Sequence, residues 1–135
     1  MRVLVVEDEQ AVAQLLTLML ETDADFEVKI ARDSAAAERI LKDDSEEFDG
    51  IVLDLNLGNS MGLHTYEKIR GAAPETAIIT YTGDLDEQTS RRLASDGVRV
   101  LIKGLADSAT IVPIIRGSIA SFKATRTVKQ LLNSA

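Results

Sequence analysis

Short apolar runs recur along the chain, and their β-branched residues and polar boundaries are typical of β-strands. The first, third and fourth runs are almost wholly apolar, as expected for strands buried on both faces of a parallel sheet. The second run contains Glu27 and Lys29, which favours a position near the sheet edge. The five predicted strands are Val3–Val6, Phe26–Ala31, Ile51–Leu53, Thr76–Tyr81 and Val98–Ile102.

Each predicted strand is followed by a segment with helical character. Asp33 or Ser34 is a candidate N-cap for the second helix, and Gly97 is expected to end the polar fourth helix, which begins near Asp86. Pro113 fits the last helix only within its first turns. The acidic stretch Asp43–Glu47 is expected to be a solvated loop. Apolar residues at helical spacing define the other helices: Val12, Leu15, Leu16, Met19 and Leu20; Ala37, Ile40 and Leu41; Leu63, Tyr66 and Ile69; and, after Asp107, Ile111, Ile114, Ile115, Ile119 and Phe122.

Five strand–helix units in succession predict a doubly wound α/β fold, with a five-stranded parallel sheet covered by helices on both faces. The length of 135 residues suits one domain of ordinary size, and 45% of the residues are hydrophobic. In such sheets, ligands bind beyond the carboxyl ends of the strands. The residues that follow each strand are therefore the candidates for chemistry.

Acids follow the first and third predicted strands, a hydroxyl follows the fourth and a lysine follows the fifth. Several carboxylates close together repel one another unless a cation neutralises them, and oxygen ligands of this kind suit Mg²⁺. Lysine and threonine can hold phosphoryl oxygens, and a carboxylate can act as a nucleophile in aspartyl-phosphate chemistry. The residues concerned are Glu7, Asp8, Glu9, Asp54, Asn56, Thr82 and Lys103.

Taken together, these pieces resemble the response-regulator receiver domain of two-component signalling. The matching segments are Leu4–Glu9, Val52–Leu57, Gly62, Ile79–Gly83 and Lys103. The resemblance covers about residues 1–123 and implies the flavodoxin-like strand order 2-1-3-4-5. Residues 124–135 are then a basic C-terminal tail, either a helix extension or a linker.

The resemblance also implies a role for each site residue. Asp54 would accept the phosphoryl group, and Thr82 and Lys103 would hold the phosphoryl oxygens. Asp8, Asp54 and the backbone carbonyl of Asn56 would bind Mg²⁺, and Glu7 would reach the metal directly or through water. The domain would be modified by a histidine kinase or a histidine phosphotransfer protein, and would not be an enzyme with a separate substrate.

Three positions depart from the family pattern. Val100 stands where an aromatic residue is usual, Gly104 replaces the proline that follows the lysine, and Gly58 replaces a proline in the loop after Asp54. Tyr81 is expected on the strand face opposite to that of Thr82, because side chains alternate along a strand. We expect ordinary phosphoryl acceptance with an unusual output surface.

Composition narrows the function further. The chain has no cysteine and one histidine, His64, which we interpret as a surface residue rather than a phosphodonor. The net charge of −7 argues against binding of nucleic acid. No apolar run approaches a membrane span and no secretory leader is evident, so a cytoplasmic location is expected.

The basic tail has two interpretations. Arg116, Lys123, Arg126 and Lys129 are the only charged residues after residue 115, and Val128, Leu131 and Leu132 continue the helical spacing. The tail is either a frayed linker or an extended helix used for dimerisation or docking, together with the fourth and fifth helix region.

Three other functions compete with the phosphoacceptor. A receiver-fold interaction module that never uses phosphate is opposed by the presence of all the site residue types. A hydrolase working through an aspartyl intermediate is disfavoured because Asn56 is not a general acid. A nucleotide- or flavin-binding protein lacks a glycine-rich loop after the first strand.

Overall fold

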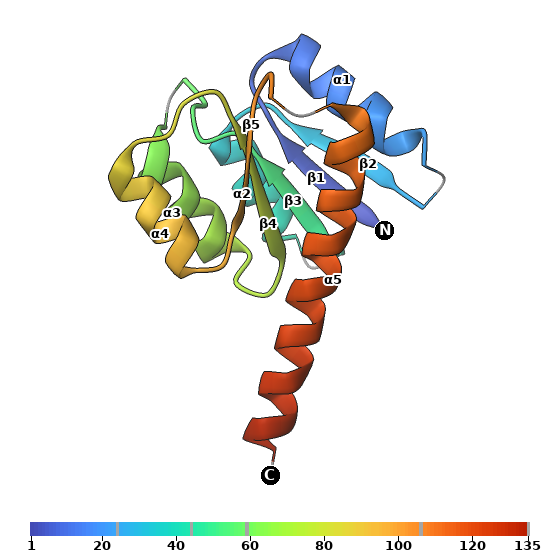
Figure 1. Cartoon of the computed structure of the whole chain (residues 1–135), viewed down its shortest axis with the longest axis vertical. Coiled ribbons are helices and arrows are strands. Elements are labelled where there is room, and N and C mark those ends of the chain that lie inside the picture. The colour runs from blue at the N-terminus through green and yellow to red at the C-terminus, as the bar shows by residue number, and fades with distance from the viewer. Residues whose placement is uncertain (24, 44, 59, 106, 135) are drawn as a thin grey trace.

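The computed structural model describes residues 1–23, 25–43, 45–58, 60–105 and 107–134, and forms one layered α/β fold (Figure 1). Within these residues, parallel strands lie in the order β2-β1-β3-β4-β5, which confirms the predicted topology and the edge position of β2. The elements are β1 (Arg2–Val6), α1 (Gln10–Glu21), β2 (Glu27–Ala31), α2 (Ser34–Leu41), β3 (Gly50–Leu53), α3 (Gly62–Ala72), β4 (Ala77–Thr82), α4 (Glu87–Ser95), β5 (Arg99–Ile102) and α5 (Ser108–Asn133).

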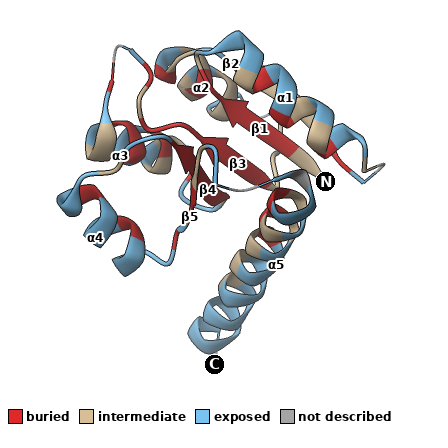
Figure 2. Ribbon diagram, turned by 45° about the horizontal axis from the view of Figure 1, so that its top comes forward, coloured by how far each residue is buried: buried red, intermediate tan, exposed pale blue. Residues whose placement is uncertain are grey.

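Two apolar cores lie on the two faces of the sheet, because successive side chains of a buried strand point to opposite faces. On one face, Leu4 and Leu53 pack with the apolar sides of α2, α3 and α4. On the other, Val5 and Val52 pack with α1 and α5. Figure 2 shows β1, β3 and β4 almost entirely buried between these layers. The buried central strands therefore fix the positions of the residues that follow their carboxyl ends.

The helix starts follow local capping chemistry. The Asp33 carboxylate accepts a 2.7 Å hydrogen bond from the backbone N–H of Ala36, so Asp33 is the N-cap of α2. The Asp86 carboxylate caps α4 in the same way, by accepting from the backbone N–H of Thr89. Both caps satisfy backbone donors that a helix leaves unpaired in its first turn.

The segment Asp43–Glu47, of which residue 44 lies outside the described residues, is an exposed loop as predicted except at Glu46. Its carboxylate is half-buried and accepts hydrogen bonds from the guanidinium of Arg2, at 3.0 Å, and the ammonium of Lys29, at 2.6 Å. These two ion pairs hold the carboxylate in its ionised form, so the pKa of Glu46 lies below its usual value. The acid therefore joins the loop to the edge of the sheet.

Helix α5 continues past the sheet to Asn133, as one uninterrupted helix with Pro113 in its second turn. The second half of the helix is held against the segments that precede β3 and β4. Lys123 pairs with Asp49, and Arg126 donates a 2.8 Å hydrogen bond to the backbone carbonyl of Glu75. The division into a domain and a tail at residue 123 stays a prediction. Among the described residues, none of the helices is both long and apolar enough to cross a membrane.

Candidate functional site

The strand register brings the candidate residues together at the carboxyl edge of the sheet. Val6 pairs with Leu53, so the residues that follow them, Glu7 and Asp54, leave adjacent strands side by side. On the other side, the backbone N–H of Lys103 donates to the backbone carbonyl of Thr82 at 2.9 Å. The site is thus built at strand ends whose positions the buried sheet dictates.

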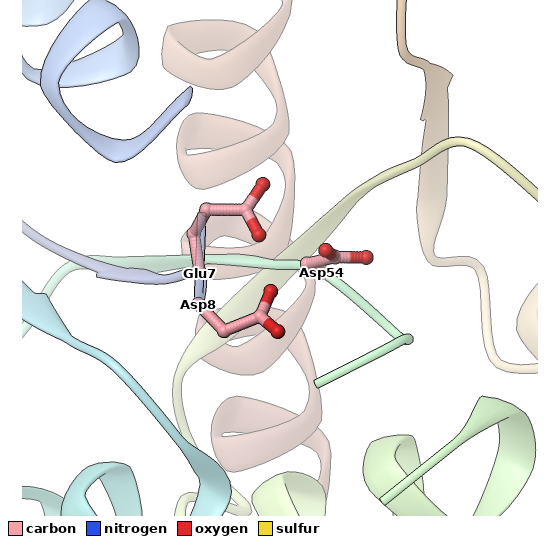
Figure 3. Close-up of side chains that lie close together, drawn as sticks. All are labelled: Glu7, Asp8 and Asp54. Carbon is pink, nitrogen blue, oxygen red and sulfur yellow. The ribbon is translucent and has the colours of Figure 1, made fainter. Parts of the chain in front are cut away.

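Three carboxylates converge there. Oxygen atoms of Glu7, Asp8 and Asp54 lie within 4.8 Å of one another, and Figure 3 shows the three side chains directed into a common space. Glu7 is only 1% exposed and Asp54 only 4% exposed, whereas Asp8 lies nearer the solvent. Buried carboxylates at this spacing repel each other and lose hydration, so they require a compensating cation.

Lys103 supplies one such cation. Its Nζ donates a 3.0 Å hydrogen bond to Asp54 Oδ2 and lies 2.6 Å from Glu7 Oε1. To reach them, the side chain crosses the end of β4, where a Cβ at Gly83 would lie 4.0 Å from Lys103 Cδ. Burial alone would lower the pKa of Lys103, but the contacts with Glu7 and Asp54 outweigh it and the pKa is raised.

Glu7 is the most deeply buried member of the cluster. Burial and the neighbouring Asp54 carboxylate raise the pKa of Glu7 to about 7, against the opposing effect of Lys103. In the part of the chain that the structure describes, Glu7 Oε1 has no hydrogen-bond partner, and its close polar contact is the ion pair with Lys103 Nζ. One ammonium is therefore left facing three carboxylates.

These residues fit a divalent cation. Three carboxylates around one small space, one of them with a buried oxygen that lacks a hydrogen-bond partner among the described residues, are a ligand set that suits a hard, oxygen-binding metal such as Mg²⁺. The backbone N–H of Asn56 donates a 3.1 Å hydrogen bond to Asp54 Oδ1, which places Asn56 beside the cluster. The metal-binding role of the Asn56 carbonyl stays a prediction.

Thr82 is the predicted site residue that is engaged elsewhere. The side chain is fully buried at the end of β4, and its hydroxyl donates a 3.1 Å hydrogen bond to the backbone carbonyl of Asp84. Tyr81 packs in the core on the other face of the sheet, with α5 residues such as Ile111, which confirms the alternation expected for β4. His64 is exposed on α3, as predicted.

The loop after β5 makes a tight turn at Gly104. The backbone N–H of Leu105 donates to the carbonyl of Ile102 at 3.2 Å, and Gly104 has φ +84°. These values define a type II turn, which requires a positive φ at its third residue. Among the described residues every peptide bond is trans. Proline at 104 could not adopt this geometry, because its ring fixes φ near −65°, so the glycine and the turn belong together.

Sequence reasoning missed the role of Arg32. The residue pattern assigns no site chemistry to the end of β2, yet the Arg32 guanidinium donates a 3.0 Å hydrogen bond to the backbone carbonyl of Asp8. It thereby supports the turn that carries Asp8 into the cluster. The signal available was a cation that follows a strand at the same sheet edge as the acids.

Solved structures share this fold. A CheY-like response regulator receiver domain protein from Methanospirillum hungatei JF-1 superposes with a TM-score of 0.79 at 21% identity, over 92% of this chain and 97% of that one. A response regulator from Burkholderia pseudomallei, solved with a phosphorylated aspartic acid, a calcium ion and citrate, gives a TM-score of 0.72 at 25% identity, over 95% and 74% of the two chains. The fold is therefore that of a CheY-like receiver.

Sequence comparison gives the family. Residues 3–116 match the response regulator receiver domain, so the chain belongs to this family of two-component signalling proteins. The transcriptional regulatory protein ComA of Bacillus subtilis (strain 168) is 32% identical over 83 residues, which are 61% of this chain and 39% of ComA. The matched region thus spans about two fifths of that relative's length.

Proposed function

We propose that this receiver domain accepts a phosphoryl group on Asp54, from a phosphohistidine of a histidine kinase or a histidine phosphotransfer protein, in an Mg²⁺-dependent reaction. The observation that carries the proposal is the position of Asp54, held by Lys103 and the Asn56 backbone within a cluster of carboxylates. A cytoplasmic location, in contact with such a donor, is part of the same proposal.

The transfer balances as one displacement at phosphorus. A carboxylate oxygen of Asp54 attacks the phosphorus atom, and a new P–O bond forms as the P–N bond to the partner's imidazole breaks. The electron pair of that bond passes to the imidazole nitrogen, which then takes a proton. The single histidine of this chain, His64, is exposed on α3, so the donor histidine comes from the partner.

The residues of this chain have separable tasks in that step. Lys103 already pairs with Asp54 and is placed to follow a transferred phosphoryl oxygen, because its ammonium is a compact charge on a flexible stem. Glu7, Asp8, Asp54 and the carbonyl of Asn56 would hold Mg²⁺, which when bound supplies positive charge that stabilises the transferring phosphoryl oxygens.

Thr82 gives the site a second state. In the structure its hydroxyl is held by the Asp84 carbonyl, at the start of the loop that leads to α4. A phosphoryl group on Asp54, with a charge of about −1.5 to −2, is a stronger acceptor and would draw this hydroxyl away. The loss of that bond would alter the β4–α4 loop, so that phosphorylation changes what the domain binds.

The chemistry proposed here is confined to the domain's own modification. Asn56, two residues after Asp54, is neither an acid nor a base, so it cannot serve as the general acid or base of a turnover enzyme acting on a separate substrate. A slow loss of the phosphoryl group to water is the only hydrolysis that the arrangement implies. The output of the switch is a change in partner interactions.

The test is incubation with a small acyl phosphate and Mg²⁺, followed by intact-mass measurement. We expect one phosphoryl adduct on the natural chain, none on Asp54→Asn, and a normal adduct on the control Glu21→Gln, because Glu21 is an exposed acid outside the carboxylate cluster. An adduct that persists in Asp54→Asn contradicts the proposal. No adduct on the natural chain would favour a receiver-fold module that acts without phosphate.

A further inference from the structure

The end of α5 is an exposed helical segment, residues 121–133, which we call the α5 extension. Figure 1 shows it running past the edge of the sheet, and Figure 2 shows its surface exposed. Three large apolar side chains lie open to solvent there: Val128 is 54% exposed, Leu131 65% and Leu132 72%. Apolar side chains gathered on one helix face are unfavourable in water and mark an interaction surface.

The exposed face of the α5 extension follows the spacing of a coiled coil, with small residues at its start and larger apolar side chains at its end. Ser121, Ala124, Val128 and Leu131 alternate at intervals of three and four residues, which is the a and d pattern of a heptad. They form a seam on the side of the helix roughly opposite Ile115 and Ile119, which pack on the sheet. Within parallel coiled coils, valine at an a position and leucine at a d position favour two strands over three or four.

The charges of the α5 extension indicate what covers this seam. Lys123, Arg126 and Lys129 fall at the outer heptad positions b, c and f, away from the seam. Lys123 and Arg126 point toward their own domain, where Lys123 contacts Asp49 and Arg126 contacts the Glu75 carbonyl.

Two copies of the extension can therefore pair without bringing like charges together. The e and g positions that flank the seam hold Thr125, Thr127, Leu132 and Ser134. An acidic helix would find no cations at these positions, where coiled coils place their interhelical ion pairs. The seam thus matches a second copy of itself better than a charged partner.

We propose that the α5 extension pairs with that of a second copy of this chain as a parallel two-helix coiled coil. The proposal is independent of phosphorylation at Asp54. The seam spans about two heptads, so we expect a reversible, concentration-dependent dimer, because helices this short are marginal alone. Dimerisation would set two receiver domains side by side with their α5 helices leading away in the same direction.

Sedimentation velocity over a concentration series tests the pairing. We expect the natural chain to pass from monomer to dimer, Leu131→Lys to weaken the dimer at least about tenfold, and the control Gln130→Lys, at an outer position, to match the natural chain. Circular dichroism should show unchanged helix content, since both side chains are exposed. A natural chain that stays monomeric to about 1 mM, or an undiminished Leu131→Lys dimer, would overturn the proposal.

A single introduced cysteine tests the orientation, because the sequence contains none. In a parallel pair the two residues at position 128 face each other, so Val128→Cys should form a disulfide-linked dimer under mild oxidation. Gln130→Cys, which faces outward, should cross-link much more slowly. Equal cross-linking of both variants, or a sedimenting species of three copies, would contradict a parallel two-helix arrangement.

Discussion

Lys103 Nζ donates a 3.0 Å hydrogen bond to Asp54 Oδ2, although the two residues follow strands separated by β4. The same ammonium lies 2.6 Å from Glu7 Oε1, so one cation joins acids from β1 and β3 to the loop after β5. Because these groups are largely buried, their mutual attraction is weakly screened by water and salt. This contact therefore holds the carboxylate cluster together.

Replacing Lys103 by methionine should destabilise the fold. The change keeps the length of the stem but leaves the Glu7 and Asp54 carboxylates without their ammonium, and stranding buried charges is strongly unfavourable. In urea denaturation without divalent cations, we expect the free energy of unfolding to fall by about 2 kcal/mol. The control Lys68→Met, at an exposed position on α3, should change it by less than about 0.5 kcal/mol. Equal effects of the two substitutions would show that the Lys103 contacts make no net contribution to the free energy of unfolding.

Mg²⁺ should raise the thermal stability of the natural chain through its carboxylate cluster. A ligand at ten times its dissociation constant stabilises the folded state by about 1.4 kcal/mol. Asp8→Asn removes one charged ligand from the cluster, so most of this gain should be lost. The control Glu21→Gln, an exposed acid at the end of α1, should retain it. A thermal melt in which Asp8→Asn responds to Mg²⁺ as the natural chain does would place the metal elsewhere.

Thr82→Val should uncouple the site from α4. The substitution keeps the shape of a buried side chain but removes the hydroxyl that bonds the Asp84 carbonyl. With a fluoride-based phosphate mimic, amide resonances of residues 84–95 should shift in the natural chain and in Thr82→Ser, and shift far less in Thr82→Val. Identical shifts in all three proteins would mean that the hydroxyl does not link Asp54 to the loop.

Introducing the family's usual proline at position 104 should destabilise the folded state of this protein. Gly104 has φ +84°, which proline cannot adopt, so Gly104→Pro should lower the free energy of unfolding by about 3 kcal/mol. Gly104→Ala should cost about 1–2 kcal/mol from the left-handed backbone alone. The matched control Gly71→Ala, within α3 and with open space around its added Cβ, should instead stabilise by up to about 1 kcal/mol. A stable Gly104→Pro variant would contradict the observed turn.

The sequence was sufficient to predict the parallel sheet and the meeting of the candidate residues at its carboxyl edge, while the strand order was implied by the resemblance to receiver domains. Buried parallel strands read as continuous apolar runs, and residues such as Asp54 and Lys103 follow them directly, so the sheet edge on which they meet is dictated by the fold. The N-cap at Asp33 was also predictable, because the preference of a carboxylate for free backbone donors is local.

What sequence reasoning missed depends on contacts between distant segments. Glu46 lies in an acidic stretch, yet tertiary structure brings Arg2 and Lys29 to it from adjacent strands. The attachment of Thr82 to the Asp84 carbonyl depends on how a loop folds back, which no residue pattern specifies. Residue spacing alone left the α5 extension ambiguous, because an exposed apolar stripe and a frayed linker have the same composition.

The central claim is that Asp54 itself carries the phosphoryl group, and localisation of the modified residue tests it most directly. After reaction with an acyl phosphate and Mg²⁺, reduction with borohydride converts an aspartyl phosphate to homoserine, which peptide mass analysis can assign to one position. We expect homoserine at position 54 and unmodified aspartate at position 8. Reduction at another acid, or none in a sample that carries a phosphoryl adduct, would contradict it.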